Sequence, residues 1–232
     1  ISVIGNGVVV DPKVLLDEIK YIKEKGINPK LIVSDRAHVI MPYHISLDHA
    51  LSNHQGKLAA GSTGKGIAPV YADKMFRNGI RIIDLLDSNV FEEKLKKGYL
   101  FSKKIIEGAF LQKFNTSIHE ILKNYLYYGE QLSPYICDTS VELYTAYQNG
   151  KSILFEGAQG ISLDVDHGIY PFTTSSNTAT GHISTGTGVT FQTINRVIGV
   201  VKGYLSRVGE SPLPTEINGA DAELLRTKGG EY

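Results

Sequence analysis

The first third of the chain alternates short apolar runs with a helical pattern. Apolar residues gather in Val3–Val10 and again in Leu31–Val33, and each run has the length of a buried strand. Between the two runs, apolar residues recur at helical spacing after Asp11, which can cap a helix, and Gly26 can end that helix. The order strand, helix, strand predicts a parallel pair of strands joined by a right-handed crossover.

The pattern becomes helical in the middle of the chain and returns to strand signals near its end. Helices are expected over Val90–Leu100, Ser102–Phe114, Ser117–Tyr128 and Thr139–Gln148. Strands are expected at Ser152–Phe155 and near Val197–Leu205, with a helix between them from His182 to Asn195.

These elements predict an α/β fold with a mostly parallel central sheet, flanking helices and an inserted helical lobe. We expect an α/β portion over residues 1–82, the helical lobe over 83–149 and a second α/β portion over 150–232.

Composition is that of an intracellular globular protein. The 232 residues are 42% hydrophobic and 21% charged, and 24 basic residues balance 24 acidic ones, so charge gives no argument for a nucleic-acid or membrane partner. The single cysteine, Cys137, excludes an internal disulfide and a cysteine-built zinc site. No signal peptide or long apolar span is visible, so we expect a cytoplasmic protein, and the start without methionine indicates a trimmed piece.

Candidate chemistry gathers in the segment FEGAQGISLDVDHGIYPFTTSSNT, from Phe155 to Thr178. It would follow the carboxyl end of the expected strand Ser152–Phe155, where open α/β sheets bind ligands. Its carboxylates, amide and hydroxyls supply donors and acceptors that suit a nucleobase edge or phosphate oxygens. The segment predicts a site for a polar small molecule.

The second glycine-rich segment, GSTGKG from Gly61 to Gly66, does not have Walker spacing, because Ala59 stands where the first glycine belongs. Its glycines and the hydroxyls of Ser62 and Thr63 can form an anion-binding nest, and a surface turn is the alternative.

Three segments together, FEGAQG with DVDHGIYPFTTSSNT, GSTGKGIAP and RVGESPLPTE, resemble adenylosuccinate synthetase in order and spacing. IGNGVVVDP and YADKMFRNGIR extend the resemblance over almost the whole chain. The resemblance implies part of a P-loop-NTPase-like synthetase, a homodimer whose substrates are IMP, L-aspartate and GTP and which uses Mg²⁺. Chains of this family are about twice as long, so the chain is expected to be a central piece without synthetase activity of its own.

The resemblance also implies four IMP-binding residues. Thr63 and Thr174 match threonines that hold the 5′-phosphate, and Gln159 matches the glutamine that contacts the hypoxanthine ring and is our candidate catalytic residue. Arg77 matches an arginine that reaches the phosphate in the partner subunit's site. Magnesium ligands and the GTP site are expected outside this chain. Taken without the resemblance, these residues are better explained as polar turns, loop hydrogen bonds and a solvated charge.

Two readings from other classes remain open. The chain can be a noncatalytic IMP-binding or dimerisation module. Alternatively, Asp164, Asp166 and His167 can bind a metal for a hydrolase, although in an extended segment His167 would point away from both aspartates. Glu156 can act as a general base or as an acceptor for backbone amides.

Overall fold

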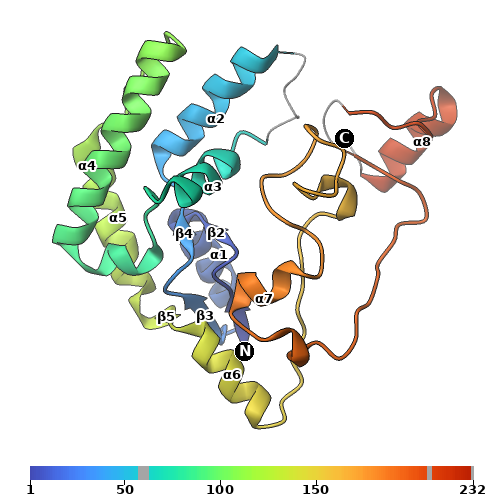
Figure 1. Cartoon of the computed structure of the whole chain (residues 1–232), viewed down its shortest axis with the longest axis horizontal. Helices are drawn as coiled ribbons and strands as arrows, with labels where there is room; N and C mark the ends of the chain where they lie inside the picture. Colours follow the sequence, from blue (N-terminus) through green and yellow to red (C-terminus); the bar gives the residue numbers. More distant parts are fainter. Residues whose placement is uncertain (57–62, 208–210, 231–232) are drawn as a thin grey trace.

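The computed structural model describes residues 1–56, 63–207 and 211–230 (Figure 1). Its strands are β1 (Ser2–Ile4), β2 (Val9–Val10), β3 (Leu31–Ser34), β4 (His38–Val39) and β5 (Ile136–Cys137). Its α-helices are α1 (Pro12–Glu24), α2 (Pro42–Gln55), α3 (Ile67–Phe76), α4 (Ser88–Lys104), α5 (Ile118–Leu132), α6 (Thr139–Gln148), α7 (His182–Thr187) and α8 (Ala220–Gly229). Short 3₁₀-helices lie at Ile82–Leu86, Ser133–Tyr135, Ile161–Leu163 and Phe191–Thr193, and α4 continues into a π-helix at Ile105–Ala109.

The described strands form two small parallel sheets. One has the order β1-β3-β5, with Val3 opposite Ile32 and Val33 opposite Ile136, and the other pairs β2 with β4. The first crossover runs from β1 to β3 through α1, as the sequence pattern predicts. The prediction of an α/β fold with parallel strands is confirmed.

Helix α1 shows how local sequence sets an element. The carboxylate of Asp11 accepts hydrogen bonds from the backbone N–H groups of Lys13 and Val14 at 3.0 and 3.2 Å, and Pro12 occupies the first helical position. Leu15 and Ile19 are buried in the core. The helix is therefore capped by its own sequence and anchored by one apolar stripe.

The core lies between the small sheets and the helices α4 and α5, which run side by side in Figure 1. Phe91 and Leu95 of α4 and Leu132 of α5 have no exposed side-chain surface. Tyr125 is also buried, and its hydroxyl donates to the carbonyl of Ile40 at 2.9 Å, which ties α5 to the segment after β4. Burying such side chains contributes roughly 1.5–3 kcal/mol each.

Two strand predictions are wrong. Residues 152–155 and 197–205 form no strand, and no described residue beyond α6 lies in one. Their apolar side chains are in solvent: Leu154 is 85% exposed and Val200 is 94% exposed. An apolar run becomes a strand only where another strand supplies hydrogen bonds, and the described residues place none beside these two runs.

The other departures concern element limits. The helix expected from His182 to Asn195 is α7 followed by the 3₁₀-turn Phe191–Thr193, with Gly188 in the left-handed region at φ 79° between them. The sheet's third strand, β5, lies inside the range 83–149 that the sequence pattern marks as helical. Within the described residues, no helix combines the length and the apolar character needed to cross a lipid bilayer.

Candidate functional site

The turn that leads into α3 is held by two buried contacts from α2. The carboxylate of Asp48, 3% exposed, accepts a hydrogen bond from the backbone N–H of Gly66 at 2.8 Å. Gly66 has φ 78°, and a Cβ there would lie 2.9 Å from the backbone nitrogen of Ile45. Only glycine fits this position, because both the backbone angle and the close approach to α2 exclude a side chain.

A buried histidine–aspartate pair makes the second contact. Met41 donates its N–H to Nδ1 of His44 at 2.9 Å, which places the ring proton on Nε2, and Nε2 donates to Asp73 Oδ2 at 2.9 Å. Burial lowers the pKa of His44, and the hydrogen bond with Asp73 opposes part of that decrease. The neutral imidazole of His44 in α2 and the carboxylate of Asp73 in α3 therefore hold the two helices together.

Thr63 and Arg77 lie at opposite ends of α3. Thr63 is exposed just before the Gly64–Gly66 turn, and Arg77 is the exposed C-terminal cap. A ten-residue helix is about 15 Å long, so one chain holds these two side chains well apart. Gly61 and Ser62 of the same segment lie outside the described residues.

Gln159 and Thr174 belong to one folded loop, residues 157–179. Gln159 is exposed and Thr174 is half-buried. The backbone N–H of Thr174 donates to the carbonyl of Leu163 at 2.8 Å, so its hydroxyl is the donor left for a ligand. Gln159 adopts φ 60°, and Arg77 adopts φ 64°. Among the described residues one other non-glycine residue, Leu111, has a positive φ, a costly conformation that often marks functional positions.

The side chain of Asp164 accepts hydrogen bonds from two parts of this loop. Its side chain is fully buried, and Oδ1 accepts the backbone N–H groups of Asp166 and His167 at 2.9 and 3.0 Å. Its Oδ2 accepts those of Thr178 and Ala179 at 2.5 and 3.1 Å. Burial by itself would raise the pKa of Asp164, but the four N–H donors outweigh it and hold the pKa well below its usual range.

Tyr71 of α3 joins the loop to the rest of the chain. Its hydroxyl donates to the carbonyl of Gly7 at 2.6 Å. Burial raises the pKa of Tyr71, and a hydrogen bond with the side chain of Ser176 opposes that shift. Thr63 lies four residues before α3, and Ser176 lies two residues after Thr174. Tyr71 therefore connects the two segments that hold the predicted phosphate-binding threonines. The helical spacing of α3 gives no signal for this role.

The other candidate residues in and beside the loop, Asp166, Glu156 and His167, either make a hydrogen bond within the loop or are exposed. Asp166 accepts a hydrogen bond from Asn177 Nδ2 at 2.5 Å, and Glu156 and His167 are exposed. The described part of the chain contains no group of three or more histidine, cysteine or acidic side chains that could hold a metal ion. The carboxylate of Asp164 is already surrounded by its backbone donors. We therefore assign no metal site to this loop.

Lys74, Arg81 and His38 form a basic cluster near the C-terminal end of α3. Burial lowers the pKa of Lys74, and the neighbouring charge of Arg81 lowers it further. His38 is 7% exposed, and burial together with Lys74 and Arg81 lowers the pKa of His38 to about 4. The sequence gives no signal for His38, because nothing in a strand pattern marks a buried imidazole.

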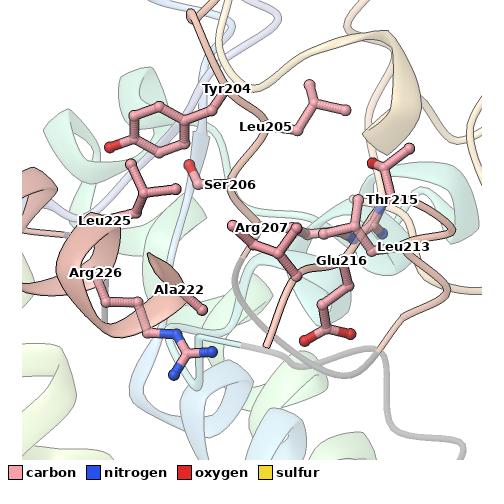
Figure 2. Close-up of a pocket in the computed structure, with 11 residues that line it drawn as sticks. Tyr204, Leu205, Ser206, Arg207, Leu213, Thr215, Glu216, Ala222, Leu225 and Arg226 are labelled. Atoms are coloured by element: carbon pink, nitrogen blue, oxygen red, sulfur yellow. The ribbon is translucent and has the colours of Figure 1, made fainter. Parts of the chain in front are cut away.

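A pocket of about 410 Å³ lies between α8 and the segments 204–207 and 213–217. Figure 2 shows the side chains of Tyr204 and Leu225 on one side and those of Leu213 and Thr215 on the other. Arg207, which also lines it, donates from its guanidinium to the carbonyl of Phe172, two residues before Thr174. None of the four predicted IMP-binding residues lines this pocket.

Comparison with known proteins gives one family. The family model "Adenylosuccinate synthetase" matches residues 1–232. An adenylosuccinate synthetase of Listeria monocytogenes serotype 4a is 48% identical over 233 aligned positions, which are 100% of this chain and 54% of the relative. One from Bacillus cereus is 47% identical with the same coverage. The chain thus spans about half the length of the curated relatives that it matches.

Comparison with solved structures gives the same family. The fully ligated adenylosuccinate synthetase of Plasmodium falciparum superposes with a TM-score of 0.92 at 34% identity, covering 100% of this chain and 54% of that one. A cyanophage S-2L succinoaminodeoxyadenylate synthetase has a TM-score of 0.50 at 22% identity over 82% of this chain and 41% of that one, which shows a shared fold.

Proposed function

Because this chain belongs to the adenylosuccinate synthetase family, we propose that it forms the IMP-binding part of a ligase that joins IMP to L-aspartate using GTP. The product, adenylosuccinate, is an intermediate in AMP biosynthesis. The observation that supports this role most directly is Tyr71 of α3, which follows Thr63 in the chain. Its hydroxyl donates to the carbonyl of Gly7, and its side-chain hydrogen bond with Ser176 reaches the loop that carries Thr174 and Gln159.

Each proposed ligand contact follows from the chemistry of its side chain. The hydroxyls of Thr63 and Thr174 donate to the 5′-phosphate of IMP. The guanidinium of Arg77 binds the same phosphate from the partner subunit with two parallel hydrogen bonds, which a lysine could not make. The amide of Gln159 offers a donor and an acceptor in one plane, which matches the edge of the hypoxanthine ring.

The reaction needs two changes at carbon 6 of the purine. Removal of the N1 proton lets the 6-oxygen attack the γ-phosphoryl group of GTP, and GDP leaves. The amine of aspartate then attacks carbon 6, and the 6-oxygen leaves as phosphate. Gln159 would orient the ring and stabilise the negative charge that builds on its edge. Holding the phosphate far from the reacting carbon lets binding free energy contribute to orientation in the chemical step.

The family's reaction depends on Mg²⁺, which neutralises charge on the transferred phosphoryl group. The described residues include no cluster of three or more histidine, cysteine or acidic side chains that could hold such an ion, so we assign no magnesium ligand to them. We expect the 232-residue chain alone to form no adenylosuccinate, because it spans only 54% of the length of the relative that it matches.

Titration calorimetry tests the IMP site. We expect the chain to bind IMP and not GTP, and Thr63→Ala and Arg77→Ala each to weaken IMP binding by about tenfold or more, because each removes a hydrogen bond to a charged group. The matched controls Thr145→Ala and Arg226→Ala change exposed residues of α6 and α8 and should leave the affinity unchanged. Equal binding of IMP by all five proteins would contradict the assignment of the site.

A further inference from the structure

The buried carboxylate of Asp164 holds two separate stretches of backbone together. Its Oδ1 accepts from residues that follow it directly, Asp166 and His167, while its Oδ2 accepts from Thr178 and Ala179, fourteen and fifteen residues later. The side chain of Asn177 adds a longer contact to Oδ1 at 3.4 Å. A single side chain therefore closes the loop at its base.

The surrounding backbone agrees with this closure. Thr174 donates to Leu163 at 2.8 Å, Val165 donates to the carbonyl of Ser176 at 3.3 Å, and the hydroxyl of Thr178 donates to the carbonyl of Gly160 at 2.9 Å. These bonds join the stretch 160–165, which contains Asp164, to the stretch 174–178. They set where Thr174 lies, and they begin one residue after Gln159.

The charge of Asp164 is balanced by backbone dipoles. None of the ion pairs found among the described residues includes Asp164, and its low pKa keeps it ionised at neutral pH. A carboxylate that accepts several backbone N–H groups is stable in the charged form even when it is buried. Because these four N–H groups donate to Asp164, they are not available to a ligand.

We propose that Asp164 is a positioning residue, which holds Thr174 and Gln159 in the geometry that binds the nucleotide without touching the nucleotide itself. This inference rests on the proposed function for the identity of the ligand. The closure of the loop by Asp164 stands independently of it, and the two can be measured apart.

The test is Asp164→Asn. The asparagine has the same shape, but whichever way its amide turns, its NH₂ group faces one of the two pairs of N–H donors, so that pair loses its acceptor. The matched control is Asp87→Asn. Asp87 also accepts two backbone N–H groups, at the start of α4, and asparagine is an equally good cap there.

Hydrogen exchange measures the closure without any ligand. In Asp164→Asn we expect the amides of Thr178 and Ala179, or those of Asp166 and His167, to exchange at least tenfold faster, while amides of the core strand β3 keep their protection. In Asp87→Asn all four loop amides should exchange as in the parent chain. Unchanged exchange in Asp164→Asn would overturn the proposal, whatever the nucleotide data show.

Calorimetry with IMP measures the positioning. We expect Asp164→Asn to raise Kd at least tenfold, and adding Thr174→Ala to it to cost less than Thr174→Ala costs in the parent chain, because the displaced threonine has already lost its contact. Fully additive effects, or parent-like affinity in Asp164→Asn, would overturn the positioning role. Failure of the parent chain to bind IMP would contradict the proposed function instead, and hydrogen exchange would still decide whether Asp164 closes the loop.

Discussion

At the scale of single residues, His38 is a buried imidazole among cations. Its Nδ1 has no hydrogen-bond partner, and the charged groups that act on it are Lys74, Arg81, Asp84 and Lys94. Burial and the three cations lower the pKa of His38 to about 4, and Asp84 opposes them. The ring is therefore neutral in the folded chain and would gain a proton on unfolding at mildly acidic pH.

The first prediction follows from that difference. Between pH 6.5, the ordinary histidine value, and pH about 4, the unfolded chain binds a proton that His38 in the folded chain does not. Stability should fall as the pH drops through this window, by on the order of 1 kcal/mol per pH unit. Replacing His38 with glutamine should flatten the dependence of the unfolding midpoint on pH between 6.5 and 5. The exposed His119→Gln serves as the control, and a slope equally steep in both variants would refute the role of His38.

At the scale of elements, two glycines allow the helices to approach closely. Gly98 of α4 faces Tyr43, whose hydroxyl would lie 2.6 Å from an added Cβ, and Gly129 of α5 faces the backbone carbonyl of Leu85, 2.7 Å from an added Cβ. Neither glycine has a positive φ, so helix propensity would favour alanine at both. An alanine at Gly129 would nevertheless clash, because the atoms that it would face are the Cβ and backbone atoms of Leu85, which cannot rotate away.

Substitution of Gly129 by alanine tests this packing. Alanine gains about 1 kcal/mol of helix propensity, and the clash with Leu85 should cost more than this gain, for a net destabilisation of about 1–2 kcal/mol. Gly108→Ala is the matched control, because nothing lies within 4 Å of an added Cβ there. Urea unfolding should show a lower midpoint for Gly129→Ala alone. A stabilised Gly129→Ala would mean that α5 and the turn at Leu85 can move apart freely.

At the scale of the whole molecule, α3 separates Thr63 from Arg77. About 15 Å of helix lies between them. The proposal that both bind one phosphate therefore predicts that they come from different subunits. A two-fold dimer would then contain two sites, each with Thr63 from one chain and Arg77 from the other.

Mixing the two variants tests this arrangement. When Thr63→Ala and Arg77→Ala chains are unfolded together and refolded, a mixed dimer contains one fully parental site and one doubly altered site. About one site in four should therefore bind IMP with parental affinity, although each variant alone binds weakly. Calorimetry gives the fraction of such sites, and refolding each variant separately is the control. No recovery on mixing would place Arg77 in the same chain's site or outside it.

Features that depend on neighbouring residues can be predicted from the sequence alone. Helix α6 lies at Thr139–Gln148 as predicted, and α1 begins at the Asp11 cap, because helical hydrogen bonds and caps are formed within a few residues. The motifs likewise identified the family, and through it the candidates Thr63, Arg77, Gln159 and Thr174, whose roles stay predictions.

Strand pairing and side-chain hydrogen bonds between residues far apart in the sequence are visible only in the folded chain. The apolar runs Ser152–Phe155 and Val197–Leu205 have the composition of strands but remain exposed coil, because a strand forms only against another strand. The sequence suggests Asp164 as a metal ligand, but its carboxylate accepts hydrogen bonds from backbone N–H groups up to fifteen residues away. A sequence shows the charge of such a side chain, whereas only the folded loop shows which hydrogen bonds satisfy it.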